Sequence, residues 1–176
     1  MNKINDRIFI VGFMGCGKTT IADNLQQHLT NYTFVDTDLV IEQINNATIT
    51  QLFAAKGESF FRNEENKLIN TLTTNNTPII VATGGGLPLH NNLMQTLRAN
   101  GTVVYLQLSP KILVQRLLTQ KKMRPLISNV SNEELLSYIT TLLQERAPTY
   151  AQAHYTINAE ESQNKIVLKL MDIIRG

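Results

Sequence analysis

The segment from Gly12 to Thr19 constrains this chain more than any other feature. It reads GFMGCGKT and matches the pattern G-x-x-x-x-G-K-[ST] in full. An apolar run at 7–11 precedes it and a helix-forming segment begins at Lys18, which is the setting that the motif requires. Glycines let successive backbone N–H groups turn inward around an anion, and the helix that follows adds the positive end of its dipole. The segment is therefore interpreted as a phosphate-binding loop. A glycine-rich turn that happens to end in Lys-Thr is disfavoured by the flanking strand and helix.

Short apolar runs alternate with longer helical segments along the rest of the chain. The expected strands are 7–11, 33–35, 78–82, 102–108 and 154–157. The expected helices are 18–29, 38–44, 49–55, 58–72, 89–99, 111–119, 133–147 and 163–174. Such alternation predicts an α/β fold, in which a mainly parallel sheet is covered by helices on both faces.

Composition limits the class of protein. With 176 residues, 43% of them hydrophobic and 17% charged, the chain suits one domain with a sizeable core, and neither a disordered chain nor a coiled coil. No apolar run is long enough to cross a bilayer, and the N-terminus has no cleavable signal pattern. The single cysteine, Cys16, excludes an internal disulfide and a cysteine-based structural zinc site. We expect a soluble, cytoplasmic, single-domain protein.

Net charge does not indicate a macromolecular partner. Sixteen Lys and Arg residues against fourteen Asp and Glu residues give a formal charge of +2, and the basic residues are scattered. Without a long basic tract we expect no nucleic-acid partner. A protein that binds small anionic substrates has the same balance of charge.

The carboxylates that could serve a magnesium site lie after the second expected strand. Many P-loop enzymes carry an acid at the end of a core strand, whereas the strand 78–82 is followed here by Thr83 and three glycines. Asp36 and Asp38 instead leave the strand 33–35 at the edge of the sheet where ligands bind. One could face a metal and the other an acceptor. In the alternative interpretation Asp38 only caps the helix beginning at Leu39.

Three arginines and a glycine run could surround an anionic ligand. Arg62 lies near the start of the expected helix 58–72, Arg124 lies in the basic, proline-containing segment 120–131, and Arg146 precedes Pro148, which we expect to end a helix. Each alone is more typical of a solvated surface, but guanidinium groups bind carboxylate or phosphate bidentately. The run Gly84–Gly86 is either a flexible turn or a place where the backbone approaches a ligand closely. The segment 120–131 is a candidate for a mobile lid.

Taken in order, the motifs GFMGCGKTT, DTD, GESFFRNEE, ATGGG, RPL and ERAPTY resemble the shikimate kinase family. The ordered set is far more specific than the phosphate-binding loop alone, and it covers nearly the whole chain. The resemblance implies a single domain over 1–176 with a three-layer α/β/α P-loop kinase fold and a five-stranded parallel sheet. It also implies a shikimate-binding helical insert at about 37–65 and a lid at about 119–131.

The resemblance implies that the protein phosphorylates the 3-hydroxyl of shikimate with ATP and Mg²⁺, on the route to chorismate and aromatic amino acids, and that it is a monomer. Lys18 would stabilise the transferring phosphoryl group, Thr19 would bind Mg²⁺ with Asp36 helping through water, and Asp38 would orient the acceptor hydroxyl or act as base. Arg124 would enter with the lid and pair with phosphate. The implied nucleotide-binding set is Gly12, Met14, Gly15, Cys16, Gly17, Lys18, Thr19, Thr20 and Arg124.

The acceptor side is implied in the same way. Arg62 and Arg146 would hold the shikimate carboxylate, and Glu65 would support Arg62. The implied acceptor-binding set is Asp38, Phe53, Phe61, Arg62, Glu65, Gly84, Gly85, Gly86 and Arg146.

Two departures from the family pattern affect the adenine contacts. Leu117 stands where relatives often carry an arginine, so that Arg116 is a candidate substitute, and the loop 158–162 lacks a basic residue. Other readings are a gluconate-type kinase, which lacks the full motif set, or a nucleoside monophosphate kinase, which would need more arginines and a base pocket. A nucleotide-binding switch would need an acid after strand 78–82.

Overall fold

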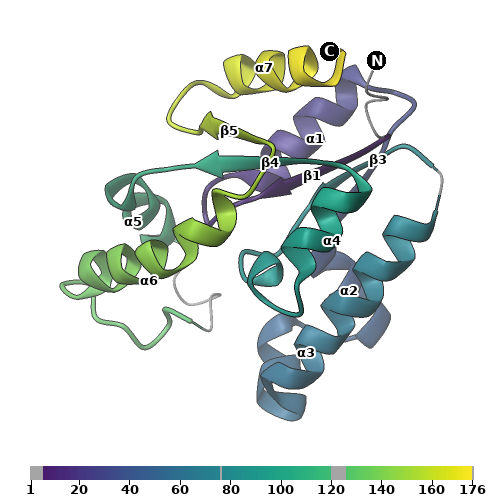
Figure 1. The fold of residues 1–176 in the computed structure, drawn as a ribbon. Coiled ribbons are helices and arrows are strands. Elements are labelled where there is room, and N and C mark those ends of the chain that lie inside the picture. The colour runs from purple at the N-terminus through teal and green to yellow at the C-terminus, as the bar shows by residue number, and fades with distance from the viewer. Residues whose placement is uncertain (1–5, 76, 120–125, 176) are drawn as a thin grey trace.

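The structure is a computed structural model that describes residues 6–75, 77–119 and 126–175 (Figure 1). Its sheet contains β1 (Arg7–Val11), β2 (Thr33–Asp36), β3 (Ile79–Ala82), β4 (Thr102–Gln107) and β5 (Tyr155–Asn158). The strand order is β2-β3-β1-β4-β5, and all four neighbouring pairs are parallel. The predicted five-stranded parallel sheet is therefore confirmed.

Burial explains which strands are central. All four residues of β3 are buried, and β1 and β4 expose little more than their ends. Their sequences are almost continuously apolar, as is typical of parallel strands covered on both faces. The edge strands β2 and β5 are more exposed and more polar. Because β1 lies at the centre, the loop that follows it emerges near the middle of the carboxyl edge of the sheet, beside the ends of β3 and β4.

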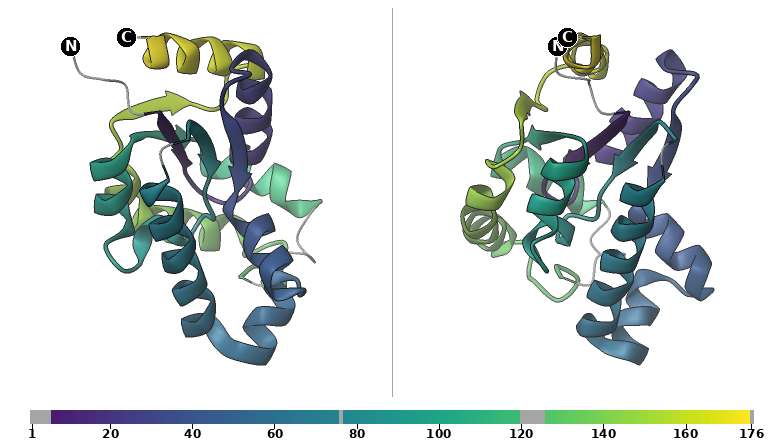
Figure 2. Two further views of the ribbon diagram at one scale, coloured as in Figure 1. Left: turned by 90° about the vertical axis from the view of Figure 1, so that its right-hand side faces the viewer. Right: turned by 45° about the vertical axis from the view of Figure 1, so that its right-hand side comes forward.

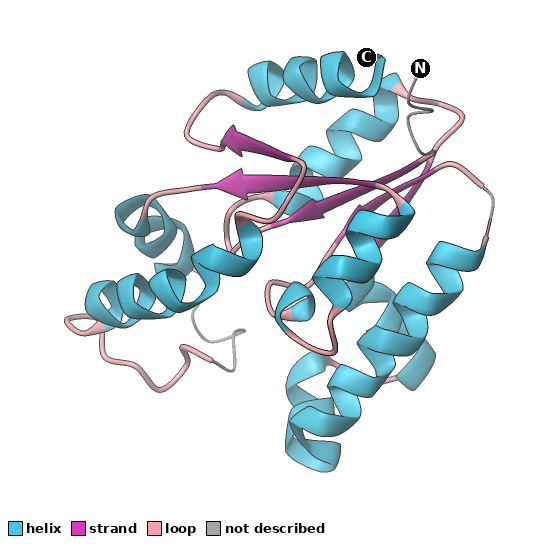
Figure 3. Cartoon of the chain, viewed as in Figure 1, coloured by secondary structure: helices cyan, strands magenta, loops and turns pink. Residues whose placement is uncertain are grey.

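Helices cover both faces of the sheet (Figures 1 and 3). The helix α1 (Lys18–His28) packs with α7 (Gln163–Arg175) on one face, while α4 (Leu93–Asn100) packs on β4 from the other. The remaining elements are α2 (Thr37–Asn45), α3 (Ile49–Thr74), the short 3₁₀ helix η1 (Leu87–Leu89), α5 (Pro110–Leu118) and α6 (Leu135–Tyr150). This is the predicted three-layer α/β/α arrangement.

The helices α2 and α3 project beyond the sheet and have a small core of their own (Figure 2). Its buried members are Ile41, Leu52, Phe61 and Leu68. Gly57 interrupts α3 with φ 78° and ψ 172°, so that the element consists of two helical pieces meeting at a kink. Two helices were expected at 49–55 and 58–72, and the kink between them confirms that division. Glycine tolerates this left-handed φ at little cost, which explains why the break falls there.

Two predicted helix boundaries are wrong. Pro148 does not end its helix, because α6 continues to Tyr150 and the Ala151 N–H donates to the Ala147 carbonyl at 2.8 Å. The proline removes one hydrogen bond of the helix, and the fully buried Tyr150 ties the last turn to the core. The helix expected at 89–99 begins only at Leu93, since η1 and a turn with positive φ at Asn91 and Asn92 precede it.

Among the described residues, no helix is both long enough and apolar enough to cross a membrane.

Gly101, the residue before β4, allows the cost of steric crowding to be measured separately from the cost of backbone strain. A Cβ atom at this position would lie 2.5 Å from the Arg7 carbonyl oxygen and 2.7 Å from Phe9 Cε2, although the backbone there is extended and unstrained. Gly101→Ala should therefore lower the free energy of unfolding by about 2 kcal/mol or more through overpacking. Urea denaturation measures this change.

The matched control is Gly57→Ala. Nothing lies within 4 Å of a Cβ at Gly57, so its cost should come from the backbone alone, about 1–3 kcal/mol, because φ 78° with ψ 172° is a conformation that essentially only glycine adopts. A free energy of unfolding in Gly101→Ala equal to that of wild type would contradict the packing argument, whatever the loss in Gly57→Ala.

Candidate active site

The loop between β1 and α1 has the geometry of a phosphate cradle. Gly12, Gly15 and Gly17 have φ values of 146°, 80° and 101°, conformations that favour glycine. A Cβ on Gly12 would lie 2.7 Å from the Leu106 carbonyl oxygen, so the loop also packs closely on the end of β4. The loop lines a pocket of about 1090 Å³, which is large enough for a nucleotide.

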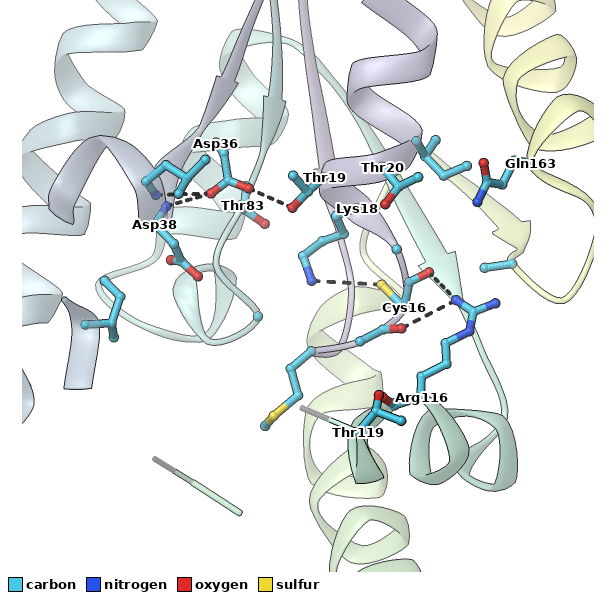
Figure 4. Close-up of a pocket in the computed structure, with 18 of the residues that line it drawn as sticks. Cys16, Lys18, Thr19, Thr20, Asp36, Asp38, Thr83, Arg116, Thr119 and Gln163 are labelled. Carbon is cyan, nitrogen blue, oxygen red and sulfur yellow. Dashed lines mark hydrogen bonds between the residues drawn. The ribbon is translucent and has the colours of Figure 1, made fainter. Parts of the chain in front are cut away.

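Lys18 begins α1 and its side chain folds back over the loop. Its Nζ donates to the carbonyls of Gly12 and Phe13 at 2.9 and 3.0 Å, and only 9% of the residue is exposed. The ammonium group is thus held inside the pocket rather than in bulk solvent. Figure 4 shows Lys18 between Asp38 on one side and Arg116 on the other. Cys16, predicted to be an incidental residue of the loop, is buried there.

Thr19 and Asp36 join the first turn of α1 to the end of β2. The Thr19 hydroxyl donates to Asp36 Oδ2 at 2.7 Å, and Asp36 Oδ1 accepts from the backbone N–H groups of Asp38 and Leu39 (Figure 4). Asp36 is therefore the N-cap of α2, which begins at Thr37. The alternative that Asp38 only caps this helix is wrong, because the cap lies two residues earlier and Asp38 lines the pocket.

Asp38 meets a second carboxylate beside the glycine turn that follows β3. A Cβ built on Gly84 would lie 2.7 Å from Asp38 Oδ1 and 3.0 Å from Glu65 Oε1. The Gly84 N–H donates to the Thr37 hydroxyl at 2.8 Å, which fastens the turn to the start of α2. Side chains are excluded from this position because two acidic side chains occupy the space.

Arg62 and Glu65 lie on one face of α3. Arg62 Nη1 donates to Glu65 Oε2 at 2.6 Å, and the Glu65 side chain is only 1% exposed. Glu65 Oε1 is buried and has no hydrogen-bond partner among the described residues. Burial raises the pKa of Glu65 to about 7, opposed by the charge and hydrogen bond of Arg62 and reinforced by the negative charges of Asp38 and Glu58. The cluster therefore holds a carboxyl group that titrates near neutrality.

Arg146 comes from α6 and is almost as buried. The residue is 9% exposed, its Cζ lies 5.3 Å from the centre of the Phe13 ring, and its Nη1 is a buried donor with no hydrogen-bond partner among the described residues. Together with burial, the positive charges of Arg62 and Arg146 lower the pKa of His90, so both guanidinium groups influence the same side chain. A buried donor without a partner costs free energy, which an anionic ligand would recover.

Sequence comparison identifies the family to which these residues belong. The sequence model of the shikimate kinase family matches residues 14–175. The shikimate kinase of Phocaeicola vulgatus is 36% identical over 159 residues, covering 90% of this chain and 90% of that protein.

The chain belongs to the shikimate kinase family.

Solved structures of the family have the same fold. The crystal structure of shikimate kinase from Bacteroides thetaiotaomicron superposes with a TM-score of 0.89 at 32% identity, covering 97% of this chain and 98% of that one. Shikimate kinase from Acinetobacter baumannii in complex with shikimate gives 0.87 at 33% identity, covering 98% and 94%. Membership confirms the predicted family, the P-loop kinase fold and the assignment as an ATP-dependent kinase.

The departure from the shikimate kinase pattern at Leu117 has a structural explanation. Leu117 is fully buried, and its Cδ2 lies 3.0 Å from where a Cβ on Gly15 would stand. Arg116 is exposed and lines the pocket, where its Nη1 donates to the carbonyls of Gly15 and Cys16 at 3.4 and 3.2 Å (Figure 4). The same end of the pocket is lined by Thr119, Ala159, Glu161 and Gln163.

The remaining predicted site residues fall into four groups. Met14 and Thr20 line the pocket, and the Met14 N–H lies 3.1 Å from where a Cβ on Gly85 would stand. Phe53 and Phe61 pack together with ring centres 5.0 Å apart, and Arg62 lies over the Phe61 ring. Gly86 lies directly beside the Arg62 guanidinium. Arg124 lies outside the described residues.

Two contributors lacked an assigned role in the sequence interpretation. The Tyr150 hydroxyl donates to the Gly85 carbonyl at 2.6 Å, which fixes the glycine turn from the side of α6. Thr37 holds Gly84 as described above. Tyr150 belongs to the motif ERAPTY and Thr37 to the motif DTD, so the motifs indicate that the two positions matter. Only the packing of elements distant in the chain reveals what the two residues bind.

Glu65 provides a test of the buried charge cluster. Its folded pKa of about 7 lies above the ordinary value of 4.5. Between these pH values the unfolded chain loses the proton while the folded protein keeps it, so stability is lost as pH rises through this window. Relative to Glu65→Gln, wild type should lose up to about 3 kcal/mol of unfolding free energy between pH 4.5 and pH 7, and the difference should be level outside it. Urea titrations at a series of pH values measure it.

Glu64→Gln is the control on the same helix. A hydrogen bond from Lys67 lowers the pKa of Glu64, so wild type should gain stability over this variant as pH rises through the acid range. The same sign for both variants would contradict the assignment of a raised pKa to Glu65.

Proposed function

We propose that this protein transfers the γ-phosphoryl group of ATP to the 3-hydroxyl of shikimate, giving shikimate 3-phosphate on the route to chorismate and aromatic amino acids. The observation that carries the proposal is the convergence at one glycine turn of a phosphate-binding loop, a carboxylate and the guanidinium group of Arg62. Gly85 touches Met14, Gly84 touches Asp38 and Gly86 touches Arg62. An acceptor that carries both a hydroxyl and a carboxylate suits this arrangement.

The phosphate-binding loop and the N-terminus of α1 bind the nucleotide. The inward N–H groups and the helix N-terminus favour phosphate oxygens. The ammonium group of Lys18 exchanges its hydrogen bonds to the loop carbonyls for hydrogen bonds to β- and γ-phosphate oxygens. Its positive charge then stabilises the negative charge on the transferring phosphoryl group. Because this electrostatic contribution is prepared before the reaction, little reorganisation is needed.

The residues Thr19 and Asp36 fit a magnesium ion. They supply a hydroxyl and a carboxylate oxygen in direct contact, and Mg²⁺ prefers such hard oxygen ligands with few carboxylates, completed by water and substrate phosphates. The described residues contain no group of three acidic, histidine or cysteine side chains that could form an all-protein metal cage, which agrees with this mode. When bound, Mg²⁺ neutralises charge on the phosphates.

The acceptor is assigned to the side of the glycine turn that faces Asp38 and Arg62, away from the phosphate-binding loop. Asp38 orients the reacting hydroxyl and accepts its proton, while Arg62 and Arg146 bind the carboxylate of shikimate through charge-assisted hydrogen bonds. Phe53 and Phe61 support Arg62 from the small core of α2 and α3. Residues of about 37–65 thus form the acceptor-binding part of a single kinase domain.

The proposal includes a lid, a cellular site and an oligomeric state. We assign about 119–131 to the lid, from which Arg124 pairs with phosphate. Thr119, at the start of this segment, lines the pocket, and Ile127 within it is fully buried. We further propose a cytoplasmic monomer that acts on a small molecule, with no nucleic acid or membrane partner.

The reaction is tested by measuring ADP release from ATP and Mg²⁺ with shikimate, and in parallel with gluconate and with AMP. We expect release that depends on shikimate and not on the other two. Folded protein that releases no ADP in response to shikimate would overturn the proposal. Dependence on gluconate or AMP would support a gluconate-type or nucleoside monophosphate kinase instead.

Replacing Asp38 tests its role toward the acceptor. Asp38→Asn removes the negative charge and the base, so kcat should fall by roughly 10²- to 10⁴-fold. Binding of ATP should change little, since the nucleotide is held by the loop and Lys18. Steady-state kinetics together with nucleotide titration measure the two effects. A kcat near that of wild type would exclude Asp38 as the orienting group.

Arg116 is the residue we assign to the adenine side. Arg116→Ala should raise the KM for ATP by roughly three- to thirty-fold, because a guanidinium group stacked on a base contributes on this scale, and leave the KM for shikimate unchanged. Arg98→Ala, on α4, is the control for loss of one positive charge. Equal KM values for ATP in the two variants would remove Arg116 from the nucleotide site.

A further inference from the structure

Glu58 is an acidic residue of the motif GESFFRNEE to which the proposed chemistry gives no role, and it forms an ion pair with Arg62. Its Oε1 accepts hydrogen bonds from both Nε and Nη2 of Arg62, at 3.1 and 3.0 Å. The two residues are four apart on the second helical piece of α3, the spacing at which side chains meet on one helix face. The contact uses the edge of the guanidinium group formed by Nε and Nη2, not the edge formed by the two terminal nitrogens Nη1 and Nη2.

The hydrogen bonds of Arg62 can be counted against its capacity. A guanidinium group has five N–H donors in a rigid plane. Glu58 takes one on Nε and one on Nη2, and Glu65 takes one on Nη1. Within the described part of the chain, one N–H therefore remains on each terminal nitrogen, and a pair of terminal N–H groups can bind two oxygens of one carboxylate.

The backbone explains why Glu58 reaches this position. The kink at Gly57 ends the first piece of α3, and Glu58 is the first residue of the second piece. The guanidinium group of Arg62 lies over the ring of Phe61, and Gly86 leaves the space beside its terminal nitrogens free of a side chain, because a Cβ there would stand 2.8 Å from Nη2 and 3.0 Å from Nη1. The side chain of Arg62 is 13% exposed, so the ion pair to Glu58 is shielded at one end.

Two physical effects of Glu58 on an incoming carboxylate have opposite signs. Its negative charge repels the acceptor, which alone would weaken binding. Its two hydrogen bonds hold the long side chain of Arg62 in one orientation, which removes an entropy cost that binding would otherwise incur. Burial of Arg62 favours the second effect, because a partly desolvated guanidinium without Glu58 would turn toward other acceptors, and Oε1 of Glu65 is a buried acceptor beside it.

We propose that Glu58 is a positioning residue that holds Arg62 with one N–H on each terminal nitrogen presented to the carboxylate of the acceptor. Glu58 and Glu65 restrain the guanidinium from two sides, Glu58 at Nε and Nη2 and Glu65 at Nη1. The inference rests on the proposed function, in which Arg62 binds the carboxylate of shikimate. Glu58 itself does not touch the acceptor in this assignment.

The experiment compares Glu58→Gln with Glu64→Gln. Glu64 lies on the same helix and also forms an ion pair within one helical turn, but with Lys67, at i,i+3, rather than with Arg62. Glu58→Gln should raise the KM for shikimate roughly three- to ten-fold, with kcat within about two-fold and the KM for ATP unchanged. Glu64→Gln should leave all three constants near wild type. Matched thermal unfolding midpoints would show that both variants are folded.

A double-mutant cycle separates positioning from a general effect of charge. Because Glu58 acts through Arg62, adding Glu58→Gln to Arg62→Ala should raise the KM for shikimate no further. A full additional increase in the double variant would overturn the proposal, and so would an unchanged or lowered KM in the single variant, which would make repulsion the larger effect.

The wild-type assay distinguishes this inference from the proposed function. If wild type shows no turnover of shikimate, both fail together. If wild type phosphorylates shikimate and the KM of Glu58→Gln matches it, the positioning role alone fails.

Discussion

The close packing of the turn Gly84–Gly86 at the carboxyl end of β3 is the constraint on which the rest of the site depends. Three elements approach the turn so closely that a Cβ at any of its residues would be crowded: Asp38 and Glu65 at its first residue, the backbone of the phosphate-binding loop at its second, and Arg62 at its third. The Tyr150 hydroxyl and Thr37 fix the same turn from α6 and α2. The phosphate-binding loop, the two carboxylates and Arg62 all pack against this one backbone segment. The distance between phosphate donor and acceptor is therefore set by the sheet that carries the turn rather than by flexible side chains.

That packing also determines the electrostatics. Two carboxylates and a guanidinium share a volume from which water is largely excluded, so burial raises the pKa of Glu65 to about 7 despite the ion pair with Arg62. Such a cluster costs free energy in the folded protein, as expected for polar groups assembled for binding rather than for stability. Nη1 of Arg146, for which the described residues supply no hydrogen-bond partner, carries a similar cost, which a bound anion would remove.

Much of this could be predicted from local sequence patterns, and the failures have physical causes. The strands were found because continuous apolar runs leave few alternatives to buried parallel strands, and the kink at Gly57 because glycine favours a break. The boundary at Pro148 was wrong because proline near the end of a helix removes only one hydrogen bond, which the burial of Tyr150 outweighs. The cap of α2 was assigned to Asp38 in one interpretation because spacing alone does not show which of two acids faces the helix. Asp36 is the cap, and its other oxygen binds Thr19.

The sequence by itself determined the succession of strands and helices along the chain, the phosphate-binding loop and the family. These depend on residues close together in the chain or on an ordered set of motifs. Only the tertiary structure decided that Arg116 lies in the pocket while Leu117 is buried beneath Gly15, and that Glu58 restrains Arg62. These outcomes depend on the rotation of a helix about its axis and on the direction of a side chain. Both are set by what the helix packs against, and that information is distributed over the whole core.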